Sequence, residues 1–86
     1  MNINQLISIV KKKLEAKIRI EKIKIEDKSF LHKKHPGNQA NKYHLKILIS
    51  STELKHINKI ESNKKIYKIL DYELKNFIHS LQILIK

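Results

Sequence analysis

The sequence predicts a single α+β domain in which helices cover one face of a small three-stranded mixed sheet. Three observations lead to this prediction. Apolar residues first recur at helical spacing and then alternate with polar residues in two stretches separated by a polar loop. A second region of helical spacing follows. A third alternating stretch comes last, so we expect the order helix, strand, strand, short helix, helix, strand.

Length and composition are those of one small globular domain spanning residues 1–86. Hydrophobic residues make up 41% of the chain, which predicts one modest core. The absence of cysteine excludes disulfides, thiolate metal sites and a cysteine nucleophile. No apolar run approaches the roughly 20 residues of a membrane span, and the first residues do not follow the order of a secretory signal. We expect a cytoplasmic protein that does not bind membranes.

The first predicted helix runs from about residue 2 to 17, and a strand follows it. The helix has an apolar stripe of the width that a core needs, and Asn2 with Gln5 can form a capping box at its start. A few residues later the pattern changes to period two, with Ile23 and Ile25 on one face. This alternation is typical of a half-buried strand.

An extended polar loop is expected at about residues 28–42. It contains the only Pro and the only Gly of the chain, and two of the five His, His32 and His35. Imidazole is a good ligand for iron or zinc, and a three-residue separation in a loop lets both rings reach one ion. Two ligands make an incomplete site, however, and the alternative is a pair of solvated loop histidines.

The second predicted strand covers residues 43–50. Leu45, Ile47 and Ile49 lie on one face of it and Leu48 on the other. With the first strand it would form an antiparallel hairpin closed by the long loop. His44 opens this strand, and we expect it to be structural.

A short helical turn, a longer helix and the third strand are predicted after that. Leu54, Ile57 and Ile60 recur at intervals of three, and Ser62 is the expected N-cap of the longer helix. The inward residues of that helix would be Ile66, Ile69, Leu70, Leu74 and Phe77. The last alternating stretch, which follows His79, predicts the third strand.

The net charge of +11 permits binding to nucleic acid. Five lysines gather around the expected start of the longer helix, where backbone N–H groups favour phosphate: Lys55, Lys59, Lys64, Lys65 and Lys68. Lys, Ile and Asn are also the residues that an AT-rich genome encodes most often, so a solvated lysine face is the open alternative. Arg19 is the only Arg, which disfavours bidentate reading of guanine.

No pattern of an enzyme active site is present. The eight carboxylates are scattered mostly among lysines, as surface pairs are. The chain has no Gly-rich phosphate loop, nucleophile elbow or zinc-protease helix motif. We expect a protein that is not an enzyme.

Four segments of the chain, in order, resemble the BolA family, whose fold is related to the class II KH domain. KLEAKI resembles the KLEAA-type end of that family's first helix, and DKSFLHKKHPG its DESxxHxxxxG loop. YHLKILISS is similar to its second strand. IYKILDYELKNFIHSLQILI follows the family's pattern through the last helix and strand, with these residues on the marked positions: Tyr67, Leu70, Glu73, Leu74, His79 and Leu81.

The resemblance implies a non-enzymatic partner of a monothiol glutaredoxin. Such proteins take part in assembling, transferring or sensing a two-iron two-sulfur cluster, for which glutaredoxin and glutathione supply thiolates and the BolA protein supplies imidazole. No cofactor is then expected in the free protein. The family also includes transcriptional regulators that bind DNA, linked to stress and cell shape, and this is the alternative function. A monomer or weak dimer is expected.

One departure from the family bears on the cluster. The resemblance implies two imidazole ligands, one in the loop and one just before the Val-Tyr pair of that family's long helix. The loop position is His32, but the second position is Asn63, whose amide is a poor donor to iron. The resemblance therefore predicts a two-part site in which only His32 remains, with His35 as a candidate replacement.

Overall fold

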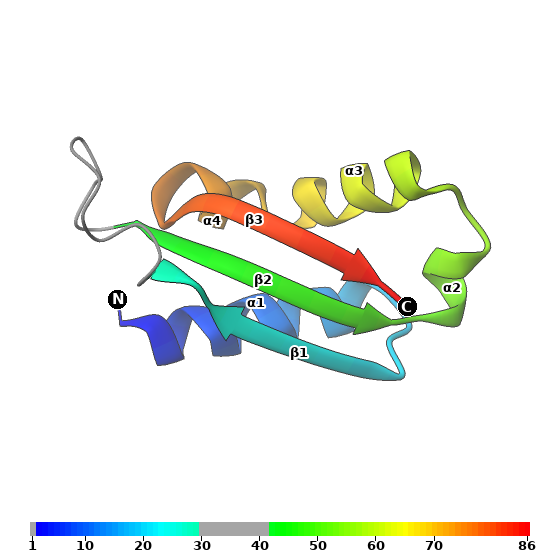
Figure 1. Ribbon diagram of the computed structural model, residues 1–86, viewed down its shortest axis with the longest axis horizontal. Helices are drawn as coiled ribbons and strands as arrows, with labels where there is room; N and C mark the ends of the chain where they lie inside the picture. The colour runs from blue at the N-terminus through cyan, green and yellow to red at the C-terminus, as the bar shows by residue number, and fades with distance from the viewer. Residues whose placement is uncertain (1, 30–41) are drawn as a thin grey trace.

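The computed structural model describes residues 2–29 and 42–86, and these residues have the predicted α+β architecture (Figure 1). The elements in chain order are α1 (Ile3–Lys17), β1 (Lys22–Asp27), β2 (Tyr43–Ser50), α2 (Thr52–Lys55), α3 (Lys59–Ile69), α4 (Asp71–Asn76) and β3 (Ile78–Ile85). The strand order is β1-β2-β3. Because β1 pairs with β2 antiparallel and β3 pairs with β2 parallel, the sheet is mixed, as expected.

Helix α1 begins with the predicted capping box. The Asn2 side chain accepts a hydrogen bond from the Gln5 amide at 2.8 Å, and the Asn2 amide donates to the Gln5 side chain at 3.0 Å. These two bonds satisfy amides that a helix start otherwise leaves unpaired. The helix buries Leu6, Val10 and Leu14 against the sheet.

The strand register separates an apolar face from an open face. Ile47 at the centre of β2 lies opposite Ile25 of β1 and Ile83 of β3, so the alternating isoleucines of all three strands face the helices. Leu48 lies opposite Leu84 on the other face, which no helix covers in the described part of the chain (Figure 1).

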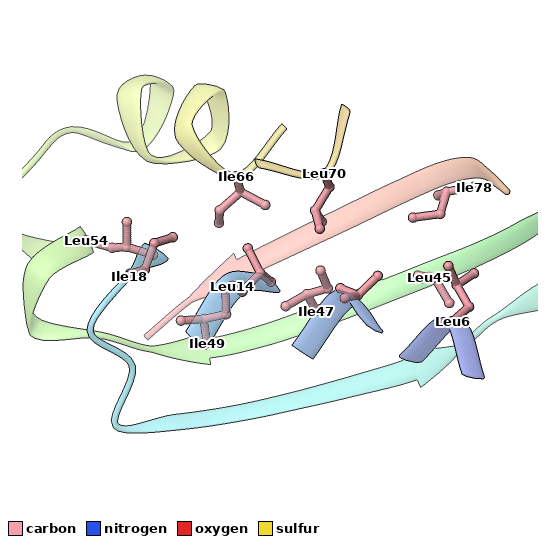
Figure 2. Packing of buried hydrophobic residues seen from close by; sticks show 11 residues of the cluster. Leu6, Leu14, Ile18, Leu45, Ile47, Ile49, Leu54, Ile66, Leu70 and Ile78 are labelled. Carbon is pink, nitrogen blue, oxygen red and sulfur yellow. The ribbon is translucent and has the colours of Figure 1, made fainter. Parts of the chain in front are cut away.

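The core lies between the sheet and the helices. Figure 2 shows Ile66 and Leu70 pointing from the helical side toward Ile47 of the sheet. The fully or almost fully buried apolar residues are Leu6, Val10, Leu14, Ile18, Leu45, Ile47, Ile49, Leu54, Ile66, Leu70 and Ile78. Helix α2 contributes Leu54, and β3 contributes Ile78. No helix in residues 2–29 and 42–86 is long and apolar enough to cross a membrane.

The start of the longer helix differs from the prediction. Asn58, not Ser62, is the N-cap, and its side chain accepts a hydrogen bond from the Glu61 amide at 2.8 Å. Ser62 lies inside α3, and its buried hydroxyl donates to the Leu54 carbonyl at 3.1 Å. Ile57 therefore lies in the connection between α2 and α3, whereas the spacing of apolar residues predicted that it would lie in the short helix. Its side chain is 40% exposed.

The predicted longer helix is divided in two. Leu70 has a φ of −97° and a ψ of 17°, which interrupts the helical backbone between α3 and α4. Its side chain is completely buried. Beyond the break, Glu73 is buried, and the predicted inward residues Leu74 and Phe77 are partly buried against the core. The spacing of apolar residues therefore continues across a break that it does not reveal.

Candidate functional site

Two histidines that lie far apart in the sequence meet at one end of the sheet. Since β2 and β3 are parallel, both strands start at this end, and His44 and His79 lie close to those starts. Their ring centroids are 4.9 Å apart, and the ring planes are inclined by 61°, an edge-to-face arrangement. The parallel pairing of the two strands thus creates a pair of imidazoles.

The two rings have different environments. His44 is only 4% exposed, and its Nδ1 atom lies 2.6 Å from the Ser80 hydroxyl oxygen. The backbone of His44 is also held, because its amide donates to the Ser29 hydroxyl at 3.1 Å and its carbonyl accepts from the Lys28 amide at 2.7 Å. His79, in contrast, is exposed. The predicted structural role of His44 is supported, while the ring of His79 is available to a partner.

Both described flanks of the loop come to this same end of the sheet. Ser29 is fixed to His44, and the amide of Tyr43 donates to the Phe77 carbonyl at 2.8 Å, next to the start of β3. The predicted ligands His32 and His35 lie outside the described residues, so metal binding by them stays a prediction. Within residues 2–29 and 42–86, no three or more His, Cys, Asp or Glu side chains form a group that could hold a metal ion.

Asn63 is not at this end of the sheet. Helix α3 starts beside the last residues of β3, since Ser62 lines a hollow with Leu84 and Ile85. An eight-residue strand such as β3 is about 25 Å long, and His79 lies near its other end. The Asn63 amide oxygen is buried and has no hydrogen-bond partner within the described part of the chain. Asn63 therefore lies away from the end of the sheet at which Ser29 and Tyr43, the described flanks of the loop, are held.

The sequence pattern places His79 at the start of the third strand, but it does not reveal that the exposed ring lies beside His44. The signal that could have identified it is topological, because only a parallel pairing of the second and third strands brings the starts of both to the loop. His56, in the connection between α2 and α3, is exposed.

The five predicted nucleic-acid-binding lysines fall into two groups. Three of them, Lys64, Lys65 and Lys68, line a hollow that also contains Glu61. Lys64 lies 3.8 Å from Glu61, and Lys65 forms an ion pair with Glu53. The other two, Lys55 and Lys59, line the separate hollow next to the end of β3, and no ion pair within the described residues involves them.

Carboxylates already occupy part of this basic region. The side chain of Glu21 accepts hydrogen bonds from the Thr52 amide at 2.6 Å and the Thr52 hydroxyl at 2.9 Å, and these bonds lower the pKa of Glu21. The hydrogen bond from Lys65, followed by the one from the Arg19 amide, lowers the pKa of Glu53. These carboxylates therefore offset positive charge at the start of α2, and the charge of Lys55 also acts on Glu21, although neither Lys55 nor Lys59 forms an ion pair among the described residues.

Comparisons with known proteins agree on one family. The family model described as BolA-like protein matches residues 14–86. A protein of Haemophilus influenzae named DNA-binding transcriptional regulator BolA is 31% identical over 75 residues, which cover 87% of this chain and 70% of that protein.

Solved structures show the same similarity. The BolA domain of SufE1 from Arabidopsis thaliana is 26% identical and superposes with a TM-score of 0.77, covering 92% of this chain and 87% of that one. BolA1 from Arabidopsis thaliana is 27% identical, with a TM-score of 0.76 and the same coverage. These similarities extend over nearly the whole fold, including the β2 and β3 strands that position His44 and His79.

Proposed function

This chain belongs to the BolA family, and on that premise we propose that it is a non-enzymatic accessory protein that binds a monothiol glutaredoxin. Together the two proteins would assemble, transfer or sense a two-iron two-sulfur cluster in the cytosol. The observation that carries the proposal is the exposed imidazole of His79, which lies beside His44 at the end of the sheet where the His-bearing loop is attached.

The residues of this chain fit a partial ligand set. An iron–sulfur cluster of this type takes four ligands, usually thiolates, and imidazole can replace thiolate on one iron. This chain has no cysteine, so the thiolates must come from glutaredoxin and glutathione. His79 is the exposed histidine at this end of the sheet that would donate a ring nitrogen to a cluster carried by the partner, and His32 or His35 would supply a second imidazole.

The neighbours of His79 would orient it for this role. Its ring packs edge-to-face on His44, which is itself held by the Ser80 and Ser29 hydroxyls and the Lys28 amide. A ring held in this way loses less rotational freedom when it binds a ligand than a free surface side chain does. The buried ring thus positions the exposed one.

Titration with a cluster-loaded monothiol glutaredoxin tests the proposal. We expect a change in the visible circular dichroism of the cluster, and shifts in the NMR signals of His79 and of residues 27–37. His79→Ala should remove most of the dichroism change, because it removes the exposed ligand. Asn63→His is the matched control, since it adds an imidazole in α3, away from this end of the sheet, and should leave the titration nearly unchanged.

Two results would contradict the proposal. One is the absence of any dichroism or NMR change at high concentrations of both proteins. The other is a gain for Asn63→His together with no loss for His79→Ala, which would place the contact on α3 instead of at the start of β3.

DNA binding is the second candidate function, and the name of the Haemophilus influenzae relative favours it. Lys55 and Lys59, which form no ion pair with another described residue, are the residues we expect to contact phosphates. Affinity for duplex DNA should fall steeply between about 50 and about 200 mM salt. Replacing Lys55 and Lys59 by Glu should reduce binding more than replacing Lys64 and Lys65, which already face carboxylates.

A sequence-selective complex that survives physiological salt would support regulation of transcription. Equal loss of binding in both pairs of variants, with no preference among DNA sequences, would indicate only the high net charge of the chain. Electrophoretic mobility shifts at several salt concentrations distinguish these outcomes.

A further inference from the structure

The two edges of the sheet differ in how they are protected against pairing with another strand. The sheet order leaves β1 and β3 at the edges. The β1 edge reads KIKIED, so four of its six residues are charged, which is a common protection against added strands. The β3 edge reads IHSLQILI and carries no Lys, Arg, Asp or Glu. The β3 edge is therefore the one on which a strand can add.

The hydrogen bonds show which backbone groups of β3 point outward. Successive residues of a strand present their backbone groups to alternate sides. The Lys86 amide donates to Ile49 of β2 at 2.8 Å, so Leu84 also faces β2. Ile83 and Ile85, one residue out of phase, then present their N–H and C=O groups to the outer side.

Tyr67 confirms this assignment and limits the open section. Its hydroxyl, which comes from α3, donates to the Leu81 carbonyl at 3.2 Å. Leu81 is in phase with Ile83 and Ile85, so the outer side of the strand is covered there by α3 (Figure 1). Among the described residues, no hydrogen bond involves the outward amides and carbonyls of Ile83 and Ile85, so these groups are left for an added strand.

A basic and partly apolar hollow adjoins the open section. It has a volume of about 240 Å³ and lies between the connection of α2 to α3 and the last residues of β3. Its walls include Ile57, which is 40% exposed, together with Leu84, Lys55 and Lys59. None of the described carboxylates forms an ion pair with Lys55, Lys59 or Lys86. An occupant of this hollow should carry negative charge and present apolar side chains.

We propose that the outer edge of β3 at Ile83–Ile85 docks an extended, acidic segment of a partner protein by addition of a strand. Backbone hydrogen bonds to Ile83 and Ile85 would provide the pairing, and alternate side chains would enter the hollow next to Ile57. The lysines of the rim select acidic residues on both sides of the paired section.

The charges and residue types disfavour two other occupants. A second copy of this chain would bring two proteins of net charge +11 together with their basic rims opposed. A single nucleic-acid strand stacks its bases on aromatic side chains. Its backbone would also have to approach the turn before α3 closely, which Gly in that turn would permit. The lining of the hollow contains no aromatic residue, and the turn contains no Gly.

A short synthetic peptide with blocked ends, Val alternating with Thr in its middle and Glu at both ends, is a direct probe. We expect it to slow hydrogen exchange of the Ile83 and Ile85 amides without affecting the outward amides of β1 in the same spectra. The same peptide with alternate backbone nitrogens methylated keeps its side chains but loses the pairing donors. It should bind at least about tenfold more weakly, as expected when backbone hydrogen bonds supply the affinity.

Matched charge variants test the rim. Lys59→Glu should weaken peptide binding by about tenfold, whereas Lys24→Glu, the same charge change on the opposite edge, should weaken it by about twofold or less. Both lysines are exposed, so both variants should fold.

Four outcomes would overturn the proposal. They are the absence of peptide binding, equal binding of the methylated peptide, and protection of other amides in place of Ile83 and Ile85. The fourth is that the Ile83 and Ile85 amides are protected by a different occupant. This would be a single-stranded oligonucleotide, or a second copy of the chain, seen as protection that grows with protein concentration together with a dimer in sedimentation.

Discussion

At the scale of single residues, the half-buried ion pair between Lys13 and Glu73 joins the first helix to the last one. The Lys13 ammonium lies 2.7 Å from the Glu73 carboxylate, whose side chain is only 4% exposed. The other carboxylate oxygen of Glu73 is buried and has no hydrogen-bond partner in the part of the chain that the structure describes. Lys13 is therefore the main compensation for a negative charge removed from water.

Lys13→Met is expected to lower the free energy of unfolding by about 1–3 kcal/mol, because it leaves the Glu73 carboxylate buried without its cation. Lys75→Met is the control, since Lys75 pairs with Asp71 at 3.0 Å but both side chains are well exposed. That variant should change stability by less than about 0.5 kcal/mol. Urea denaturation of both variants measures the difference, and equal effects would contradict the argument from burial.

At the scale of elements, the short helix α2 depends on bonds from other parts of the chain. It has only four residues, too few to be stable alone. The Ser51 hydroxyl donates to the Arg19 carbonyl at 2.7 Å, and the Glu21 carboxylate accepts from Thr52. The turn between α1 and β1 thus fixes the start of α2, and α2 in turn positions the basic hollow beside β3.

The bond from Thr52 to Glu21 predicts a pH dependence of stability. The pKa of Glu21 is lowered from 4.5 in the folded protein, so its contribution is complete above that value and is lost as pH falls through the lowered pKa. Glu21→Gln should therefore reduce the urea midpoint most at about pH 6, and the difference from the unmodified protein should shrink toward about pH 3. A difference that is constant over this range would mean that the charge of Glu21 does not matter.

At the scale of the whole molecule, the sheet has one buried face and one open face. The helices cover only the face that carries Ile47, which is completely buried, while its neighbour Leu48 is partly exposed on the opposite face. All three strands share this division because their registers place isoleucines opposite isoleucines. The stability of the domain should therefore depend on one layer of packing.

Two adjacent substitutions in β2 test this division. Ile47→Ala should cost about 2–5 kcal/mol, since it opens a cavity in the only core of the described residues. Leu48→Ala should cost clearly less, because solvent already reaches that face. Comparable losses of free energy of unfolding, measured by chemical denaturation, would show that something covers the open face in solution.

Local signals in the sequence were enough for the first helix, the three strands and the apolar faces of these elements. The capping box at Asn2 and Gln5 and the alternation in β2 both depend on neighbouring residues only, and the structure confirms both. The cap of α3 was misplaced because Ser62 and Asn58 are both suitable cap residues, and the choice depends on packing against Leu54. Helical periodicity likewise could not reveal the break at Leu70. The apolar residues Ile66 and Leu74, on the two sides of the break, keep helical spacing with Leu70.

The sequence by itself thus determined the α+β class, the core faces and the family, because hydrophobic period and collinear motifs are properties of the chain alone. Only the tertiary structure decided which histidine is exposed at the loop end of the sheet, which lysines remain unpaired and which sheet edge is open. Those properties depend on contacts between residues remote in sequence: the parallel pairing of β2 with β3 brings His79 to His44, and the return of α3 places Tyr67 on β3.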